Sequence, residues 1–361
     1  MVNLDDIQIY KRLDPENMRG HLHRLPQQCR TAWDKAKEFQ LSGDYADIDK
    51  VVILGMGGSA IGGDLVRSLF SSKKKPIIFV NRDYNLPAFV DDSTLVIASS
   101  YSGNTEETLS AFSQALKKNC KKLAITTGGE IRKLADHAGV PTFIIDYVSL
   151  PRAALGYSFM PLIAFLQKLN FIRDETGDVE AMIQDLDMLL AEFKETVAAS
   201  SNRAKQLANK LHGKIVVIYG AGVLSQVAHR WKTQINENGK AWAFYETFSE
   251  LNHNAVVGYQ FPQELASKIY VVLLRCPSLH QRILIRYEIT SELLKQSGIG
   301  HEIIDSRVKG ELNQMMGLIY LGDWVSYYLA MLNETDPTPI KTVDYLKKRL
   351  SQVKKGGESN D

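Results

Sequence analysis

Short runs of β-branched and other apolar residues recur along the chain, and stretches with the periodicity of helices separate them. These runs lie at residues 51–54, 76–80, 95–98, 123–126 and 142–145, and again at 215–218, 241–244, 270–274 and 301–304. Strands that are apolar along their whole length and alternate with helices are typical of a parallel sheet with helices on both faces. The alternation therefore predicts the α/β class, in a three-layer αβα arrangement.

The two sets of runs open alike. The segment VVILGMGG begins at Val51 and VVIYGAGV begins at Val216, and each reads as a strand followed by two glycines around a small turn. This repeat predicts an internal duplication, with two tandem, doubly wound parallel-sheet domains. We expect N-terminal helices outside the first sheet together with the first domain, a helical linker, the second domain with a C-terminal helix, and a disordered tail. The corresponding residues are 1–165, 166–210, 211–350 and 351–361.

Charge, apolar runs and cysteine content indicate which partners to exclude and which cellular compartment to expect. The 361-residue chain has a formal net charge of +2, which creates no long-range field to attract nucleic acid or an anionic membrane surface. No apolar run approaches the roughly 18 residues of a membrane span. The start MVNLDDIQIY lacks the basic and then apolar pattern of a signal peptide, and three widely spaced cysteines suit a reducing compartment. We therefore expect a cytoplasmic protein that binds neither nucleic acid nor membrane.

A cluster of hydroxyl side chains stands at the junction of a predicted strand and a predicted helix. The segment SSYSGNTEET, residues 99–108, carries six of them, and helix signals begin at Thr105. The cluster thus lies at the carboxyl edge of the sheet, where open α/β folds bind ligands. The free N–H groups of a helix N-terminus favour an anion, and Ser100, Ser102 and Thr105 can add neutral donors. Helix capping is the plainer interpretation, but it needs only one or two such residues, so we predict a site for a phosphate monoester.

A second loop, GMGGSAIGGD at residues 55–64, also follows a predicted strand. It is not a Walker loop, because no Lys-Ser/Thr pair follows the glycines. It partly fits the dinucleotide fingerprint G-x-G-x-x-A, although the acid that would hold a ribose, Asp83, comes late after the next strand. A tight structural turn is a third interpretation. We favour close approach of Gly57, Gly58 and Ser59 to a small ligand, in one pocket with the hydroxyl cluster.

Six short fragments resemble, in their order along the chain, the bifunctional phosphoglucose/phosphomannose isomerases, which carry two sugar-isomerase domains in tandem. The fragments are LGMGGSAIGGD, SSYSGNTEET, SLPRAALGY, NENGK, ELNHN and PTPIK. The resemblance implies an aldose–ketose isomerase that interconverts glucose 6-phosphate, and mannose 6-phosphate, with fructose 6-phosphate. Such an enzyme opens the sugar ring and moves a proton between C2 and C1 through a cis-enediol, and it needs neither metal nor nicotinamide cofactor.

The resemblance also implies roles for single residues. Glu237 becomes the base, and Arg152 lies beside the developing enediolate. His253 opens the ring, with Lys341 near it, although Ala255 stands where an acid is expected after the His-Asn pair. The glycine-rich and hydroxyl loops hold the sugar phosphate. Because the histidine of related isomerases can come from the neighbouring subunit, the resemblance further implies a homodimer with its active site at the subunit interface.

The assignment of Glu237 as base has support from the residues alone. The stretch 228–238 is predicted to be a helix that Gly239 ends, so this carboxylate faces the negative end of the helix dipole. That position disfavours the charge and raises the basicity of the group. A solvated surface glutamate is the plainer interpretation, and structural, ion-pairing or solvated roles are the plainer interpretations of the other three residues.

Three other functions are compatible with parts of the same pattern. A non-catalytic sugar-phosphate-binding regulator of this fold would need the hydroxyl cluster but no base, and it is our alternative function. An aminosugar enzyme would need a glutaminase domain before residue 51, which we do not expect. A nicotinamide oxidoreductase would not need the hydroxyl cluster.

Overall fold

The computed structural model describes residues 2–41, 45–72 and 76–353. The helices and strands of the first half are α1 (Ile7–Leu13), α2 (Met18–His23), α3 (Leu25–Glu38), β1 (Lys50–Leu54), α4 (Gly57–Leu69), β2 (Ile77–Asn81), β3 (Thr94–Ser99), α5 (Glu106–Leu116), β4 (Lys121–Thr126), α6 (Gly129–His137), β5 (Thr142–Ile144) and α7 (Leu155–Lys168). Those that follow are α8 (Thr176–Phe193), α9 (Arg203–Leu211), β6 (Ile215–Gly220), α10 (Ser225–Glu237), β7 (Ala243–Thr247), β8 (Ile269–Arg275), α11 (Gln281–Gln296), β9 (Gly300–Asp305), α12 (Glu311–Leu332) and α13 (Lys341–Gln352). Short 3-10 helices join them, namely η1 (Pro151–Ala153), η2 (Ala199–Ser201), η3 (Gly222–Leu224), η4 (Glu250–His253), η5 (Ala255–Gln260) and η6 (Gln263–Lys268).

Parallel strands form where the apolar runs predict them. In the described part of the chain, the first sheet has the order β2-β1-β3-β4-β5 and the second has the order β7-β6-β8-β9. β6 thus repeats the place of β1, and β7, β8 and β9 repeat β2, β3 and β4. The predicted α/β class with two parallel-sheet domains is confirmed. In each half, the chain leaves the first strand toward one edge of the sheet and leaves the third strand toward the other edge. Open α/β sheets bind ligands between two such strands, at their carboxyl ends.

β1 shows why the first sheet has helices on both faces. Val51 and Ile53 belong to the large core that includes α4 and α7, whereas Val52 and Leu54 pack with Phe112 of α5 on the other face. The four β1 side chains are at most 1% exposed. Burying a side chain of this kind contributes about 1.5–3 kcal/mol, so a slip of one residue along the sheet would be costly and the register is fixed.

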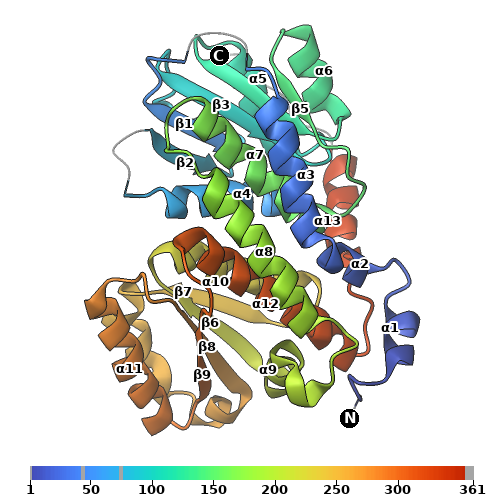
Figure 1. Ribbon diagram of the computed structural model, residues 1–361, viewed down its shortest axis with the longest axis vertical. Helices are drawn as coiled ribbons and strands as arrows, with labels where there is room; N and C mark the ends of the chain where they lie inside the picture. Colours follow the sequence, from blue (N-terminus) through green and yellow to red (C-terminus); the bar gives the residue numbers. More distant parts are fainter. Residues whose placement is uncertain (1, 42–44, 73–75, 354–361) are drawn as a thin grey trace.

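α12 lies at the centre of the second half. All of its residues except Glu311 are buried, and it packs on α8, α9 and α10. In Figure 1, α8 runs from the upper half of the molecule to the lower half and so braces the two sheets. No helix in the described ranges combines the length and apolarity that a bilayer span requires. Of the tail predicted to be disordered, residues 351 and 352 belong to α13, and residues 354–361 lie outside the described residues.

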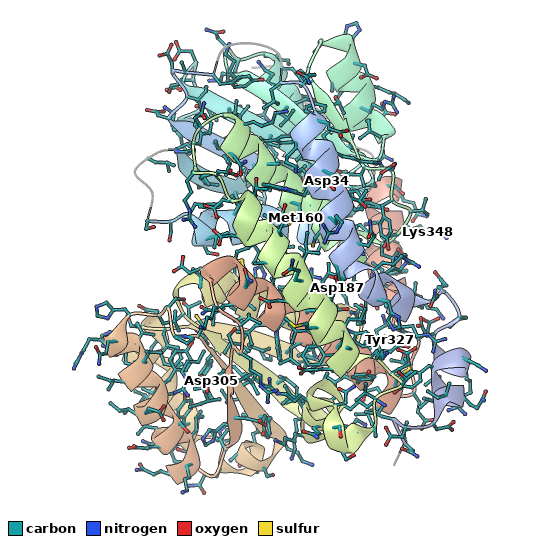
Figure 2. The ribbon with its side chains drawn as sticks, in the orientation of Figure 1. Asp34, Met160, Asp187, Asp305, Tyr327 and Lys348 are labelled. Atoms are coloured by element: carbon teal, nitrogen blue, oxygen red, sulfur yellow. The ribbon has the colours of Figure 1, made fainter. Side chains whose placement is uncertain are left out.

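The first two helices pack differently from the expectation. α3 packs on α7 of the first half, but α1 and α2 pack on α12 of the second half. Tyr327 of α12, labelled in Figure 2, donates its hydroxyl to Asp14 Oδ2 at 3.0 Å, and its ring stacks on Tyr10 of α1. Tyr320 donates to the Leu22 carbonyl of α2 at 2.9 Å. The tyrosines of α12 therefore bind the first two helices to the second half of the molecule. The sequence of α1 and α2 alone does not indicate this packing.

Candidate active site

The glycine-rich loop ends β1 and begins α4. Gly57 is the first residue of α4 and has a φ of +49°, a left-handed conformation that favours glycine. No side chain among the described residues caps α4, so its first N–H groups can bind an anion. Ser59 Oγ accepts a hydrogen bond from the Tyr101 N–H at 3.0 Å. The glycine-rich loop and the hydroxyl loop are therefore in contact where β1 and β3 end.

The hydroxyl loop joins β3 to α5, whose N-cap residue is Thr105. In the described structure the Thr105 side chain makes no capping bond; its oxygen instead accepts from Ser100 Oγ at 3.2 Å. Ser100 Oγ in turn accepts from the Gly103 N–H at 3.2 Å, and Ser102 Oγ accepts from the Asn104 N–H at 3.3 Å. These hydroxyls thus shape the loop without capping the helix, contrary to the capping interpretation. An anion placed here would meet both backbone N–H groups and hydroxyl donors.

Gly58 brings Arg152 to the start of α4. A Cβ atom on Gly58 would lie 2.7 Å from the carbonyl carbon of Pro151 and 2.9 Å from the Arg152 nitrogen. Those distances are too short for any side chain, so only glycine lets η1 pack this closely on α4. The SLPRAALGY fragment therefore joins the glycine-rich loop in space, although about 90 residues separate the two in the sequence.

Neighbouring groups hold the Arg152 guanidinium on several sides. The residue is 3% exposed, and its Nε donates to Asn238 Oδ1 at 2.8 Å. Nη2 donates to the Pro337 and Thr338 carbonyls, at 2.8 and 2.6 Å. Nη1 lies 3.6 Å from Glu237 Oε2. Burial lowers the pKa of Arg152, and the negative charge of Glu237 opposes that shift. A fixed cation therefore stands beside the carboxylate that the sequence marks as the base.

Glu237 is the last residue of α10, close to where the sequence predicts the helix to end. Its side chain is 33% exposed, so the carboxylate can contact Arg152 and still meet a ligand. α10 packs on α4, and the end of this second-half helix therefore lies near the loops of the first half. The site therefore draws on both halves of the duplicated chain.

Sequence reasoning missed two residues of this group, Asn238 and Lys240, although both lie in the NENGK fragment. Asn238 is fully buried and binds Arg152. Lys240 as a whole is exposed, yet its Nζ donates to the Glu237 carbonyl and, at 3.2 Å, to the Pro337 carbonyl. Burial of this amine, and then the charge of Arg152, lower the pKa of Lys240 to about 8. The signal for both residues was their place one and three positions after the predicted base.

His253 and Lys341 stand apart from this group. His253 ends η4 and is exposed, and no described residue forms a hydrogen bond or ion pair with its ring. Lys341 is the exposed first residue of α13, three positions after the Thr338 carbonyl that binds Arg152. A single chain thus brings together the two loops, Arg152 and Glu237, whereas no hydrogen bond or ion pair in the described structure joins His253 to them.

The end of β2 does not offer the acid that a dinucleotide ribose would need. Asn81 ends that strand, and its amide donates to the Asp83 and Asn85 carbonyls at 3.2 and 3.1 Å. Asp83 itself accepts from the next N–H, that of Tyr84, at 2.6 Å.

Within the described ranges there is also no group of three His, Cys, Asp or Glu side chains that could hold a metal ion. The donors of the site suit an anion.

Comparison with known proteins places the chain in a family. Residues 44–139 match the model of the SIS domain, and residues 200–350 match the model of the bacterial phospho-glucose isomerase C-terminal SIS domain. A bifunctional phosphoglucose/phosphomannose isomerase from Caldicellulosiruptor bescii is 45% identical over 334 residues, which are 92% of this chain and 98% of that protein. The chain belongs to the bifunctional phosphoglucose/phosphomannose isomerase family. A member of this isomerase family from Thermoplasma acidophilum is 35% identical over 92% of this chain and 100% of its own length.

A solved structure resembles most of the length of this family member. The crystal structure of a hypothetical protein from Thermus thermophilus has a TM-score of 0.71 at 17% identity, over 96% of this chain and 94% of that one. At this identity the likeness shows the fold alone. It agrees with a fold of two parallel sheets in tandem.

Proposed function

We propose that this chain interconverts glucose 6-phosphate, and mannose 6-phosphate, with fructose 6-phosphate at the site formed by its two loops, Arg152 and Glu237. The family membership supports the reaction. The observation that carries the site is the 3.6 Å pair of Arg152 Nη1 and Glu237 Oε2, which Gly58 brings to the start of α4. A carboxylate and a fixed cation beside an anion-binding loop are the groups that an aldose–ketose isomerisation needs.

Neutral donors hold the phosphate in this proposal. The N–H groups of α4 and α5 and the hydroxyls of Ser59, Ser100, Ser102 and Thr105 surround the ester, with Gly57 and Gly58 allowing close approach. Neither helix carries a side-chain cap in the described structure, which leaves their N–H groups to the ligand. Because these donors are uncharged, the positive charge that faces the Glu237 carboxylate comes from Arg152 and not from the phosphate loops.

Glu237 moves the hydrogen. After the ring opens, the carboxylate takes the proton from C2, the electron pair of that bond forms the C1=C2 double bond of a cis-enediol, and the π pair of the C1 carbonyl moves to its oxygen. The same proton then returns to C1, the proton of the C2 hydroxyl passes to the C1 oxygen, and the C2 oxygen becomes the carbonyl, so no atom is gained or lost. Arg152 Nη1, on the side of the guanidinium that faces Glu237, stabilises the negative oxygens of the intermediate. C2 is planar in the enediol, and this is how one base can serve both epimers.

A homodimer completes the site in this proposal. No residue of α13 is buried within one chain. Its apolar side chains Val343, Leu346 and Leu350, with Val353 just beyond the helix, follow one face and are 38–69% exposed. A helix of this length is marginal in water without a packing partner, and Figure 2 shows Lys348 of α13 at the outer edge of the molecule. We propose that this face packs on a second copy, and that His253 of each copy enters the site of the other near Lys341.

The dimer can be tested by a charge on the apolar face. Leu346→Asp is expected to give a monomer in sedimentation and to lose turnover, because the charge cannot be buried at the contact. Lys348→Asp, on the opposite face, is the matched control and should leave the mass unchanged. A fully active monomer would contradict the proposal. We also propose a cytoplasmic location, which suits the three buried free thiols of Cys29, Cys120 and Cys276.

The test of the function is Glu237→Gln. Turnover with each hexose 6-phosphate, measured with and without a chelator, should fall by about 10²–10⁴-fold, the usual contribution of a general base. Binding of fructose 6-phosphate, measured by calorimetry, should persist. Retained turnover would remove Glu237 as the base. Wild-type protein that binds the sugar phosphate but never turns it over would instead favour the non-catalytic regulator.

A further inference from the structure

A closed circuit of hydrogen bonds lies behind Arg152. Its Nε donates to Asn238 Oδ1 at 2.8 Å, and Asn238 Nδ2 donates to Ser326 Oγ at 3.0 Å. Ser326 Oγ donates to the Asp323 carbonyl at 2.7 Å. Arg230 Nη2 donates to Asp323 Oδ2 at 2.8 Å and to the Arg152 carbonyl at 3.0 Å. The circuit thus begins at the Arg152 side chain and ends at the Arg152 carbonyl.

The members of this circuit behind Arg152 cannot touch a substrate directly. The other four residues, Asn238, Ser326, Asp323 and Arg230, are at most 3% exposed, and their hydrogen bonds in the circuit join them to one another and to Arg152. Both polar atoms of the Asn238 side-chain amide already form hydrogen bonds, to Arg152 and Ser326. In the described structure the Arg230 side chain donates to the Arg152 carbonyl and to Asp323 Oδ2. The hydrogen bonds of Arg230 and Asp323 therefore reach the site through Arg152, whose carbonyl Arg230 binds directly.

Close packing of α10 on α12 fixes the circuit. Trp231, next to Arg230, donates its indole N–H to the Leu318 carbonyl at 2.8 Å. A Cβ atom on Gly322, next to Asp323, would lie 2.3 Å from that indole nitrogen. The absence of a side chain at Gly322 sets the distance between the two helices, and hence the place of the ion pair that they share.

A buried ion pair is a costly way to join two helices. Removing both charges and filling the space with apolar side chains is often neutral or stabilising, whereas removing one charge leaves the other buried and unpaired. Arg230 lies near Arg152, and its positive charge disfavours the charge of Arg152. The Asp323 carboxylate neutralises Arg230, so the Arg152 guanidinium remains the effective positive charge beside Glu237.

We propose that Arg230 and Asp323 are positioning residues for the isomerisation: their buried pair fixes the Arg152 carbonyl and, through Ser326 and Asn238, the orientation of its guanidinium. This inference rests on the proposed function, in which Arg152 stabilises the enediolate. The pair acts on the transition state and not on the phosphate, because the two phosphate loops make no hydrogen bond to any member of the circuit in the described structure.

The experiment removes both charges together. Arg230→Met with Asp323→Leu is expected to fold, to lower kcat on the order of 10- to 100-fold, and to leave KM for glucose 6-phosphate within about twofold. The control is a second ion pair away from the site, in which the buried Lys205 of α9 lies 2.9 Å from the 42% exposed Asp5. Lys205→Met with Asp5→Leu should leave both constants within about twofold.

A double-mutant cycle separates the possible outcomes. Arg152→Lys alone should lower kcat, and adding the two circuit changes to it should cause little further loss, because both act through one group. Losses that multiply, or an unchanged kcat in the circuit variant, would overturn the inference and leave the proposed function intact. An unchanged kcat in Arg152→Lys would overturn the proposed role of Arg152 and this inference with it. If the circuit variant does not fold, Ser326→Ala, which removes a single neutral link, must show the same fall in kcat at constant KM, and no fall would refute the proposal.

Discussion

Replacing Thr105 by valine removes one hydroxyl from the proposed phosphate site while keeping the volume of the side chain. The structure indicates that little else is lost, because among the described residues this hydroxyl does not cap α5 and has one hydrogen-bond partner, Ser100 Oγ at 3.2 Å. A hydrogen bond to a charged group is worth about 1.5–3 kcal/mol. At about 1.36 kcal/mol per factor of ten, Thr105→Val should raise KM for glucose 6-phosphate by about 10- to 150-fold.

The stability of this variant should change little. One neutral hydrogen bond contributes about 0.5–1.5 kcal/mol, which for a chain of this size corresponds to a melting temperature about 1–2 °C lower. Thr105→Ser is the matched control, since it keeps the hydroxyl and should retain the wild-type KM. A change confined to the melting temperature would mean that the hydroxyl is structural.

Steady-state rates and inhibition by inorganic phosphate together test the reasoning. If Thr105 binds the ester group, the inhibition constant of phosphate must rise by the same factor as KM, because both ligands present the same oxygens. An unchanged KM, or a KM that rises while phosphate inhibits as before, would refute the placement of the ester at this loop.

Three further predictions follow from the same geometry. Gly58→Ala should displace η1 and with it Arg152, since its Cβ would lie 2.7 Å from the Pro151 carbonyl carbon. It should lower kcat, and it should lower stability by about 1–3 kcal/mol. The control is Gly177→Ala in α8, where a Cβ meets open space; it should leave kcat unchanged and should not lower stability, because alanine favours a helix over glycine. The pKa of Lys240 is lowered to about 8 in the folded chain, so above that pH the unfolded chain binds more protons and the free energy of unfolding should rise with pH. Urea titrations at pH values of about 7 and 9.5 should therefore show a larger gain for the wild type than for Lys240→Met, and equal gains would contradict the assigned shift. Arg152→Lys should lower kcat more than it raises KM, because a lysine cannot reproduce the three-sided contacts of the guanidinium, and the reverse split in steady-state rates would assign Arg152 to substrate binding.

The strands and the duplication could be predicted because they depend on local pattern. Residues 51–54 are apolar on both faces, and this continuous run already requires helices above and below the sheet. The repeated strand-and-glycine segment at Val216 then predicts the second sheet, whose strand order repeats that of the first. The hydroxyl loop could be placed for the same reason, since a strand-to-helix junction in a parallel sheet always lies at its carboxyl edge.

The contacts that complete the site could not be predicted in this way. Arg152 binds Asn238, 86 positions away, and the carbonyl of Pro337, 185 positions away. No periodicity links these residues, and they meet only because α10 and α12 of the second half pack against the first. The place of α1 and α2 was hidden for a similar reason, because the side chains that hold them, such as Tyr327, belong to a helix about 300 residues later.

The central claim is that neutral donors hold the phosphate and leave one carboxylate free to move hydrogen between C1 and C2. The most direct measurement is a crystal structure with fructose 6-phosphate. We predict ester oxygens within about 2.6–3.2 Å of the Ser59, Ser100 and Thr105 hydroxyls, with C1 and C2 against the Glu237 carboxylate. An ester bound by lysine or arginine side chains, or bound away from the Ser100–Thr105 turn, would contradict the account.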